Sequence, residues 1–288
     1  MTPRVAAAVA GVPGLTRAPW LRRHPLAGFF ALTFAWSWTC WLLSPALKAQ
    51  SSLLATLLMF VGSFGPSIAA VVVVAYGGGR AGLRVWFGRC LQWRVGAGWM
   101  ALAFFLPLAL MSLAAAMHIA LGGAIAPSPA AGHVLMAAVN FFLIFLVGGP
   151  LGEEFGWRGY ALGPLQDRHG WRIASLVLGA IWGVWHLPLF FIDGTSQAHI
   201  PLALFLLSVV AMSVLFAWLA RHTAGSVVPA LVLHTAINAW PSIIPVLPTG
   251  ESHRPYALVV ALLVLVALGL LAQPRFGGPA FSQPKRAP

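Results

Sequence analysis

The segment GGPLGEEFGWRG, residues 148–159, decides how this chain is organised. It contains Glu153 and Glu154, two of only five acidic residues among 288, and Arg158 follows Glu154 by four positions. The uncharged apolar run 134–147 precedes it. A charged side chain at membrane depth costs about 2.5 to 3.5 kcal/mol on insertion scales, and residues kept there usually serve function. The sequence therefore predicts a functional site within a membrane segment.

The composition is that of an integral membrane protein. Hydrophobic residues make up 60% of the chain and charged residues 8%, whereas a soluble domain carries about 25% charged residues. The formal net charge of +12 reports membrane topology, and no nucleic-acid partner is expected because no nucleic-acid-binding motif accompanies it. Cys40 and Cys90 lie outside any CxxC or zinc-ribbon spacing, so we expect two free thiols.

Eight apolar stretches are long enough to cross a bilayer, which takes about 20 helical residues. They are residues 26–47, 53–76, 99–121, 134–160, 173–192, 201–220, 226–247 and 256–272. The fourth should break at Gly148-Gly149-Pro150, because proline removes a backbone donor and glycine loosens the helix. We expect an all-α, polytopic transmembrane bundle of about eight spans. Its membrane-embedded domain is residues 26–272, with a motif core at 134–238, between tails at 1–25 and 273–288.

The basic residues support this layout. All Lys and Arg residues except Lys48 and Arg254 lie in the tails or near span ends that the eight-span layout places on the same side of the membrane. Arg158 is included because it lies near the end of its predicted span. Because cytoplasmic loops are enriched in Lys and Arg, both termini are predicted to be cytoplasmic. We expect an integral protein of the bacterial cytoplasmic membrane, with membrane lipids among its partners.

The linker 77–98 interleaves apolar residues with arginines. This pattern predicts a basic amphipathic segment in the cytoplasmic headgroup region. We expect it to face lipid as an anchor and to take no part in catalysis.

Helix geometry separates the two glutamates. Residues four apart share a helix face, whereas adjacent residues point about 100° apart. Glu154 and Arg158 are therefore expected to form an ion pair, and Glu153 is left without a local partner. Such a carboxylate suits a general base or acid.

Two later spans each place a histidine in the apolar region. Trp182 and His186 share one helix face, as do His234 and Asn238. Counted from the predicted cytoplasmic helix ends at 1.5 Å per residue, Glu153 and both histidines lie roughly 10 to 20 Å below the same surface. Three helices are thus expected to bring a carboxylate, imidazoles and a carboxamide to comparable depths.

These residues resemble the CPBP intramembrane proteases, which include the type II CAAX prenyl endopeptidases and bacteriocin-processing and immunity proteins. The family pattern is EExxxR, then FxxxH, then HxxxN or a similar small residue. The corresponding segments here are EEFGWR at 153–158, WGVWH at 182–186 and HTAIN at 234–238. Trp182 stands where the family usually has Phe, and we expect a wall residue there that leaves the chemistry untouched.

The resemblance implies hydrolysis of a peptide bond within or at the membrane. It implies that Glu153 activates water with help from His186, while His234 and Asn238 stabilise the oxyanion. Glu154 and Arg158 would hold the site in shape. The expected substrate is a membrane-associated or prenylated peptide or protein.

The sequence leaves two alternatives for this site, with and without a bound metal ion. Glu153, His186 and His234 would also make a His₂Glu zinc set with an open position. The sequence lacks HExxH, however, and Glu153 cannot easily be both ligand and general base. A glutamate-dependent mechanism without a metal is therefore favoured, and zinc stays an alternative.

Two other functions fit parts of the same pattern. A non-catalytic scaffold or immunity protein would bind a partner in the same cavity and would tolerate loss of Glu153. A proton-coupled transporter would use Glu153 and the histidines as a relay. The transporter is disfavoured because the polar groups gather near one surface and the second half does not repeat the first.

Overall fold

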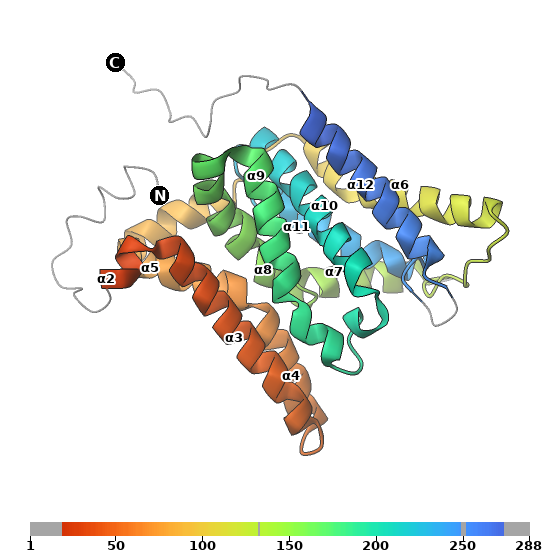
Figure 1. The fold of residues 1–288 in the computed structure, drawn as a ribbon, viewed down its shortest axis with the longest axis horizontal. Coiled ribbons are helices and arrows are strands. Elements are labelled where there is room, and N and C mark those ends of the chain that lie inside the picture. The colour runs from red at the N-terminus through yellow and green to blue at the C-terminus, as the bar shows by residue number, and fades with distance from the viewer. Residues whose placement is uncertain (1–18, 132, 249–251, 274–288) are drawn as a thin grey trace.

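The computed structural model describes residues 19–131, 133–248 and 252–273, and all the regular secondary structure in these ranges is helical. The predicted tails lie outside the described residues, apart from residue 273 and residues 19–25, which include the short helix α2 (Pro19–Arg23). Figure 1 shows the helices packed in one bundle from which the pair α3 (Pro25–Lys48) and α4 (Ser52–Ser63) projects. The all-α prediction is confirmed.

Six helical segments in the described ranges are apolar and long enough to cross a membrane. Four of them are the single helices α3, α6 (Ala97–Ala120), α10 (Leu202–His222) and α12 (Arg254–Ala272). The other two are α5 (Gly65–Cys90) and the joined segment 150–191. Helices α4 and α7 (Val134–Val147) are apolar but shorter. The membrane character is confirmed, whereas the count of eight spans and the orientation of the termini stay predictions.

Several predicted spans are interrupted helices. The second is divided at Phe64 between α4 and α5, and α5 runs on to Cys90 through the expected linker. The seventh consists of α11 (Val228–Ala239) and the 3₁₀ turn η4 (Trp240–Ser242). Proline begins or nearly begins many of these helices, since its missing N–H costs nothing there.

The fourth span breaks where the sequence predicts. Helix α7 ends at Val147, and α8 (Pro150–Gly156) begins after Gly149, whose φ is 108°. The π-helix η1 (Trp157–Ala161) follows and leads into α9 (Leu162–Trp185). Helix α9 bends at Gly170 and passes into the 3₁₀ helix η2 (Leu187–Phe191); a second 3₁₀ turn, η3 (Gln197–His199), precedes α10. A glycine at φ 108° allows the sharp turn that aims α8 into the bundle.

Contacts between linkers define one end of the bundle. The carbonyl of Cys90, the last residue of α5, accepts a hydrogen bond from the amide of Val227, before α11 (2.9 Å). Arg172 in α9 donates to the carbonyl of Gln273 after α12. Segments at span ends that were predicted to lie on one side are therefore in contact in two pairs.

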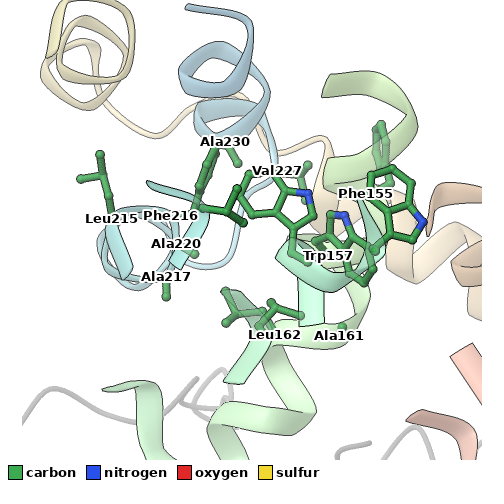
Figure 2. Close-up of a cluster of buried hydrophobic side chains, with 14 of the residues drawn as sticks. Phe155, Trp157, Ala161, Leu162, Leu215, Phe216, Ala217, Ala220, Val227 and Ala230 are labelled. Atoms are coloured by element: carbon green, nitrogen blue, oxygen red, sulfur yellow. The ribbon is translucent and has the colours of Figure 1, made fainter. Parts of the chain in front are cut away.

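A buried core holds η1 against α10 and α11. Trp157 and Phe216 are completely buried, as are Ala161 and Val227. Figure 2 shows these side chains gathered between the three elements. The core fixes the segment that carries the two glutamates. Cys40 and Cys90 are free thiols, as predicted.

Candidate active site

Glu153 is placed by the break before α8. A Cβ atom on Gly149 would lie 2.7 Å from Glu153 Oε1, which is closer than real Cβ contacts come. A side chain at position 149 would therefore push the Glu153 carboxylate from its place, and the positive φ also favours glycine there. The sequence analysis predicted the break but missed this close approach of backbone to carboxylate.

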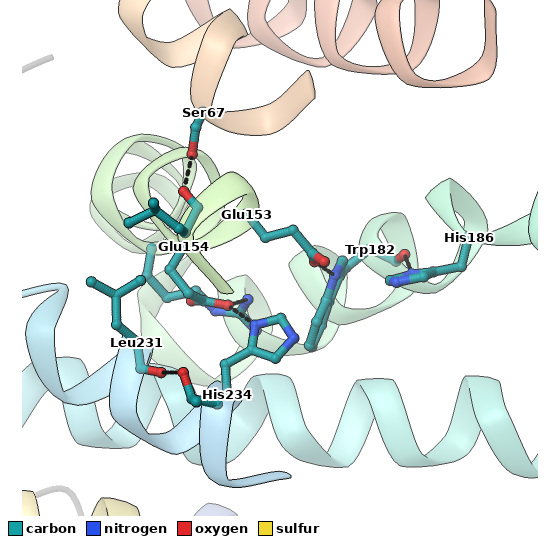
Figure 3. A network of polar contacts seen from close by, with 10 residues as sticks. Ser67, Glu153, Glu154, Trp182, His186, Leu231 and His234 are labelled. Carbon is teal, nitrogen blue, oxygen red and sulfur yellow. Dashed lines mark hydrogen bonds and ion pairs between the residues drawn. The ribbon is translucent and has the colours of Figure 1, made fainter. Parts of the chain in front are cut away.

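Glu154 is the centre of a buried charged network. Its Oε1 accepts from Arg158 Nη1 at 2.9 Å and from His234 Nδ1 at 2.7 Å. The predicted ion pair is confirmed, and Glu154 is 0% exposed. Arg158 is buried as well. It therefore does not contribute to the surface charge at the predicted cytoplasmic end of its span, where the topology argument had counted it. Figure 3 shows the Glu154 side chain beside the His234 ring.

Aromatic rings complete the surroundings of Arg158. Its guanidinium carbon lies 4.3 Å from the ring centre of Trp182 and 3.9 Å from that of Phe216. Such cation–π contacts stabilise a desolvated guanidinium by about 2 kcal/mol. One nitrogen, Nη2, and Glu154 Oε2 are buried without a hydrogen-bond partner in the described structure.

Trp182 contacts the candidate base directly. Its indole N–H donates to Glu153 Oε2 at 2.6 Å, and its ring lies 5.8 Å from the His186 ring and 5.6 Å from the His234 ring. Trp182 is therefore more than a wall residue, because phenylalanine has no donor for the carboxylate, whereas its effect on the chemistry stays a prediction. The signal was available in the sequence: a buried indole N–H generally finds an acceptor.

His186 is held in one tautomer. Its Nδ1 lies 2.8 Å from the backbone carbonyl of Trp182, and a carbonyl oxygen can only accept, so Nδ1 carries the proton. The neutral ring then presents the lone pair of Nε2. Figure 3 shows His186 one helical turn beyond Trp182 on α9.

Asn238 lies where the seventh span faces the break before α8. Its Nδ2 donates to the carbonyl of Gly148 at 3.0 Å. One of the two amide N–H groups is thus used, and the second remains for another acceptor. Asn238 is exposed, unlike Glu153 and the two histidines.

A cavity of about 680 Å³ joins these groups. Glu153, Trp182, His186, His234 and Asn238 all line it. Its remaining wall is mostly apolar and aromatic, and includes Trp41, Phe60, Trp185 and Phe205. The predicted convergence of the carboxylate, the imidazoles and the carboxamide is therefore present.

The donors do not assemble a metal site. Among the described residues, no three His, Cys, Asp or Glu side chains are grouped to hold an ion. The hydrogen bonds of the predicted ligands use Glu153 Oε2 and His234 Nδ1, and leave Glu153 Oε1 and the Nε2 atoms of both histidines without a protein partner in the described part of the chain. Zinc therefore stays an alternative to the glutamate-dependent mechanism, and no step below depends on a metal.

The fold and the site define a membrane-type helical protein with an acid–imidazole centre inside. Residues 135–240, which contain all three motifs, match the family model described as type II CAAX prenyl endopeptidase Rce1-like. Over 221 residues the chain is 25% identical to the CAAX prenyl protease 2 of Methanococcus maripaludis, covering 73% of this chain and 81% of that relative. The resemblance to the CPBP proteases is thereby confirmed: over its motif core this chain is similar to the CAAX prenyl proteases.

Proposed function

We propose that the chain is an intramembrane endopeptidase in which Glu153 activates water. One observation carries this proposal: two hydrogen-bond acceptors without protein partners face the same cavity. Glu153 Oε1 and His186 Nε2 make no hydrogen bond within the described part of the chain, and both residues line the cavity. A water molecule has two protons to donate, so these acceptors suit its binding and deprotonation.

The hydrolytic step needs only these groups and a peptide bond. Glu153 takes a proton from water as the oxygen attacks the carbonyl carbon. The tetrahedral intermediate then breaks its C–N bond, and Glu153 returns the proton to the leaving amine. The products are a carboxylate and an amine. Trp182 holds one oxygen of Glu153 and leaves the other for the water.

His234 and Asn238 would stabilise the oxyanion. His234 Nδ1 faces Glu154, so this ring can donate to the oxyanion only in the form that carries a proton on Nε2 as well. That second N–H and the unused amide N–H of Asn238 are donors for the developing charge. One such donor is worth about 10²- to 10³-fold in kcat.

The substrate we propose is a membrane-associated chain with a prenylated C-terminus. The matched family and the archaeal relative are both named for CAAX prenyl substrates, and the aromatic cavity wall suits a hydrocarbon beside the reacting bond. Hydrolysis at a prenylated cysteine would release the residues that follow it.

Cleavage of a matched peptide set tests the proposal. The purified protein, reconstituted in vesicles, is offered a prenylated CAAX-type peptide, its unprenylated twin and an unrelated transmembrane peptide. Mass spectrometry is expected to show product from the prenylated peptide, and H186A should slow its formation. The variant T235V serves as control, since the Thr235 hydroxyl donates only to the Leu231 carbonyl in its own helix. No product from any peptide would overturn the proposal.

A further inference from the structure

The end of α5 and the linker after it form a basic arm, defined here as residues 80–94. Gly79 separates the arm from the rest of α5 with φ 56° and ψ −153°, a conformation that only glycine adopts readily. The arm therefore leaves the direction of the preceding helix and follows its own course along one end of the bundle.

The inner face of the arm packs on the protein rather than on lipid. Trp86 and Cys90 are buried, and Leu83 and Phe87 are half-buried. The rings of Trp86 and Phe87 lie 6.0 and 5.8 Å from that of Phe155 in α8. The expectation that the apolar residues of this segment anchor it in lipid is wrong for this face, because the helix that carries the glutamates covers it.

The arm is hydrogen-bonded to both sides of the candidate site. The carbonyl of Gly159, next to Arg158 in the π-helix, accepts from Trp86 Nε1 at 3.0 Å and from Arg89 Nη2 at 2.8 Å. The carbonyl of Gln92 accepts from Ser226 Oγ at 2.6 Å, just before the helix that carries His234. A displacement of the arm would thus act on the elements that position the site.

The outer face of the arm carries charge without counter-charge. Arg80, Arg84, Arg89 and Arg94 are exposed, and the only ion pairs among the described residues are those of Glu154. Arg80 and Arg84 also share a helix face, where like charges repel. Among them lie Val85 and Trp93, which are 70% and 69% exposed. Arginines with exposed apolar side chains between them match a surface of anionic headgroups above acyl chains.

We propose that the basic arm binds anionic phospholipid headgroups and that this binding stabilises the active arrangement of the site. The membrane surface would act through Trp86 and Arg89 on the Gly159 carbonyl. Arg89 can contact Gly159 and a lipid headgroup at the same time, because one guanidinium nitrogen donates to the Gly159 carbonyl and its other N–H groups remain for a phosphate. The effect on catalysis rests on the proposed endopeptidase function, whereas the binding does not.

Lipid binding is tested first, without any substrate. Native mass spectrometry of the purified protein measures adducts with phosphatidylglycerol and with phosphatidylcholine. We expect R80Q/R84Q to bind phosphatidylglycerol about 30-fold more weakly, because each arginine near an anionic surface contributes about 1 kcal/mol and 1.4 kcal/mol is a factor of ten. R80K/R84K and K48Q, at an exposed site outside the arm, should bind like the wild type. Equal losses in R80Q/R84Q and K48Q would overturn the assignment of this surface.

Coupling to the site is tested by cleavage in two kinds of vesicle. Wild-type activity should rise about 5-fold or more when phosphatidylglycerol is added to phosphatidylcholine, within the usual range of coupling between sites. W86F keeps every charge of the arm but loses the donor to Gly159, so it should bind phosphatidylglycerol normally and lose the stimulation. R89Q removes the other donor to Gly159 and should also lose the stimulation. It serves as a second test of the coupling if W86F does not fold.

Two results separate the possible failures. Equal wild-type rates in both vesicles would overturn the coupling. Lipid binding that depends on Arg80 and Arg84, with no cleavage in either vesicle, would overturn the endopeptidase proposal and leave the lipid surface supported.

Discussion

The charge network around Glu154 predicts that stability and activity can be separated by mutation. E154Q keeps an oxygen for both Arg158 and His234, which lie 2.9 and 2.7 Å from Oε1, and removes only the charge. Arg158 is then a buried cation without a counter-ion, and breaking a buried pair in this way costs about 3 to 5 kcal/mol. R158M should remove most of that cost, because it takes away the buried charge that E154Q leaves without a counter-ion.

The assay has two parts. Unfolding in mixed micelles should show E154Q less stable than the wild type by about 3 to 5 kcal/mol and E154Q/R158M close to the wild type. Peptide cleavage should fall about 10²- to 10³-fold in both variants, because without the Glu154 charge His234 no longer offers a second N–H to the oxyanion. T235V should change neither. A double variant that is as unstable as E154Q, or as active as the wild type, would refute the reasoning.

Three further substitutions and one treatment test the site. G149A should reduce activity and stability together in cleavage and unfolding assays, because a methyl group would meet Glu153 Oε1 at a positive φ. N238A should lower kcat about 10²-fold or more, with KM less affected; an unchanged kcat would remove Asn238 from the oxyanion site. W182F should lower kcat about 10- to 100-fold through loss of a hydrogen bond worth about 1.5 to 3 kcal/mol; full activity would limit Trp182 to packing. A chelator should leave the rate unchanged, and rescue of chelated protein by zinc would contradict this.

Local periodicity predicted the parts of the site that lie on one helix. The Glu154–Arg158 pair follows from a spacing of four, and the break before α8 follows from two glycines and a proline. The common cavity of Glu153, His186 and His234 follows from comparable depths in a membrane. In the first two cases the signal is contained in a few neighbouring residues, and in the third it comes from counting residues along three separate spans.

Contacts between distant segments could not be predicted in this way. Trp86 and Arg89 lie about 70 residues before the Gly159 carbonyl that they contact, and no periodicity links the two segments. The division of the second span at Phe64 and the π-helix after Gly156 are also set by packing. A helix that is apolar throughout shows no preferred face, so sequence alone does not tell which neighbour it contacts.

The most direct test of the account is the cleavage rate of E153Q beside the wild type, in the same vesicles and on the same prenylated peptide. Glutamine keeps the size of the side chain and cannot take a proton from water. The account predicts that E153Q unfolds like the wild type and yields no product above the uncatalysed background. A well-folded E153Q that cleaves at the wild-type rate would contradict the assignment of Glu153 as the general base.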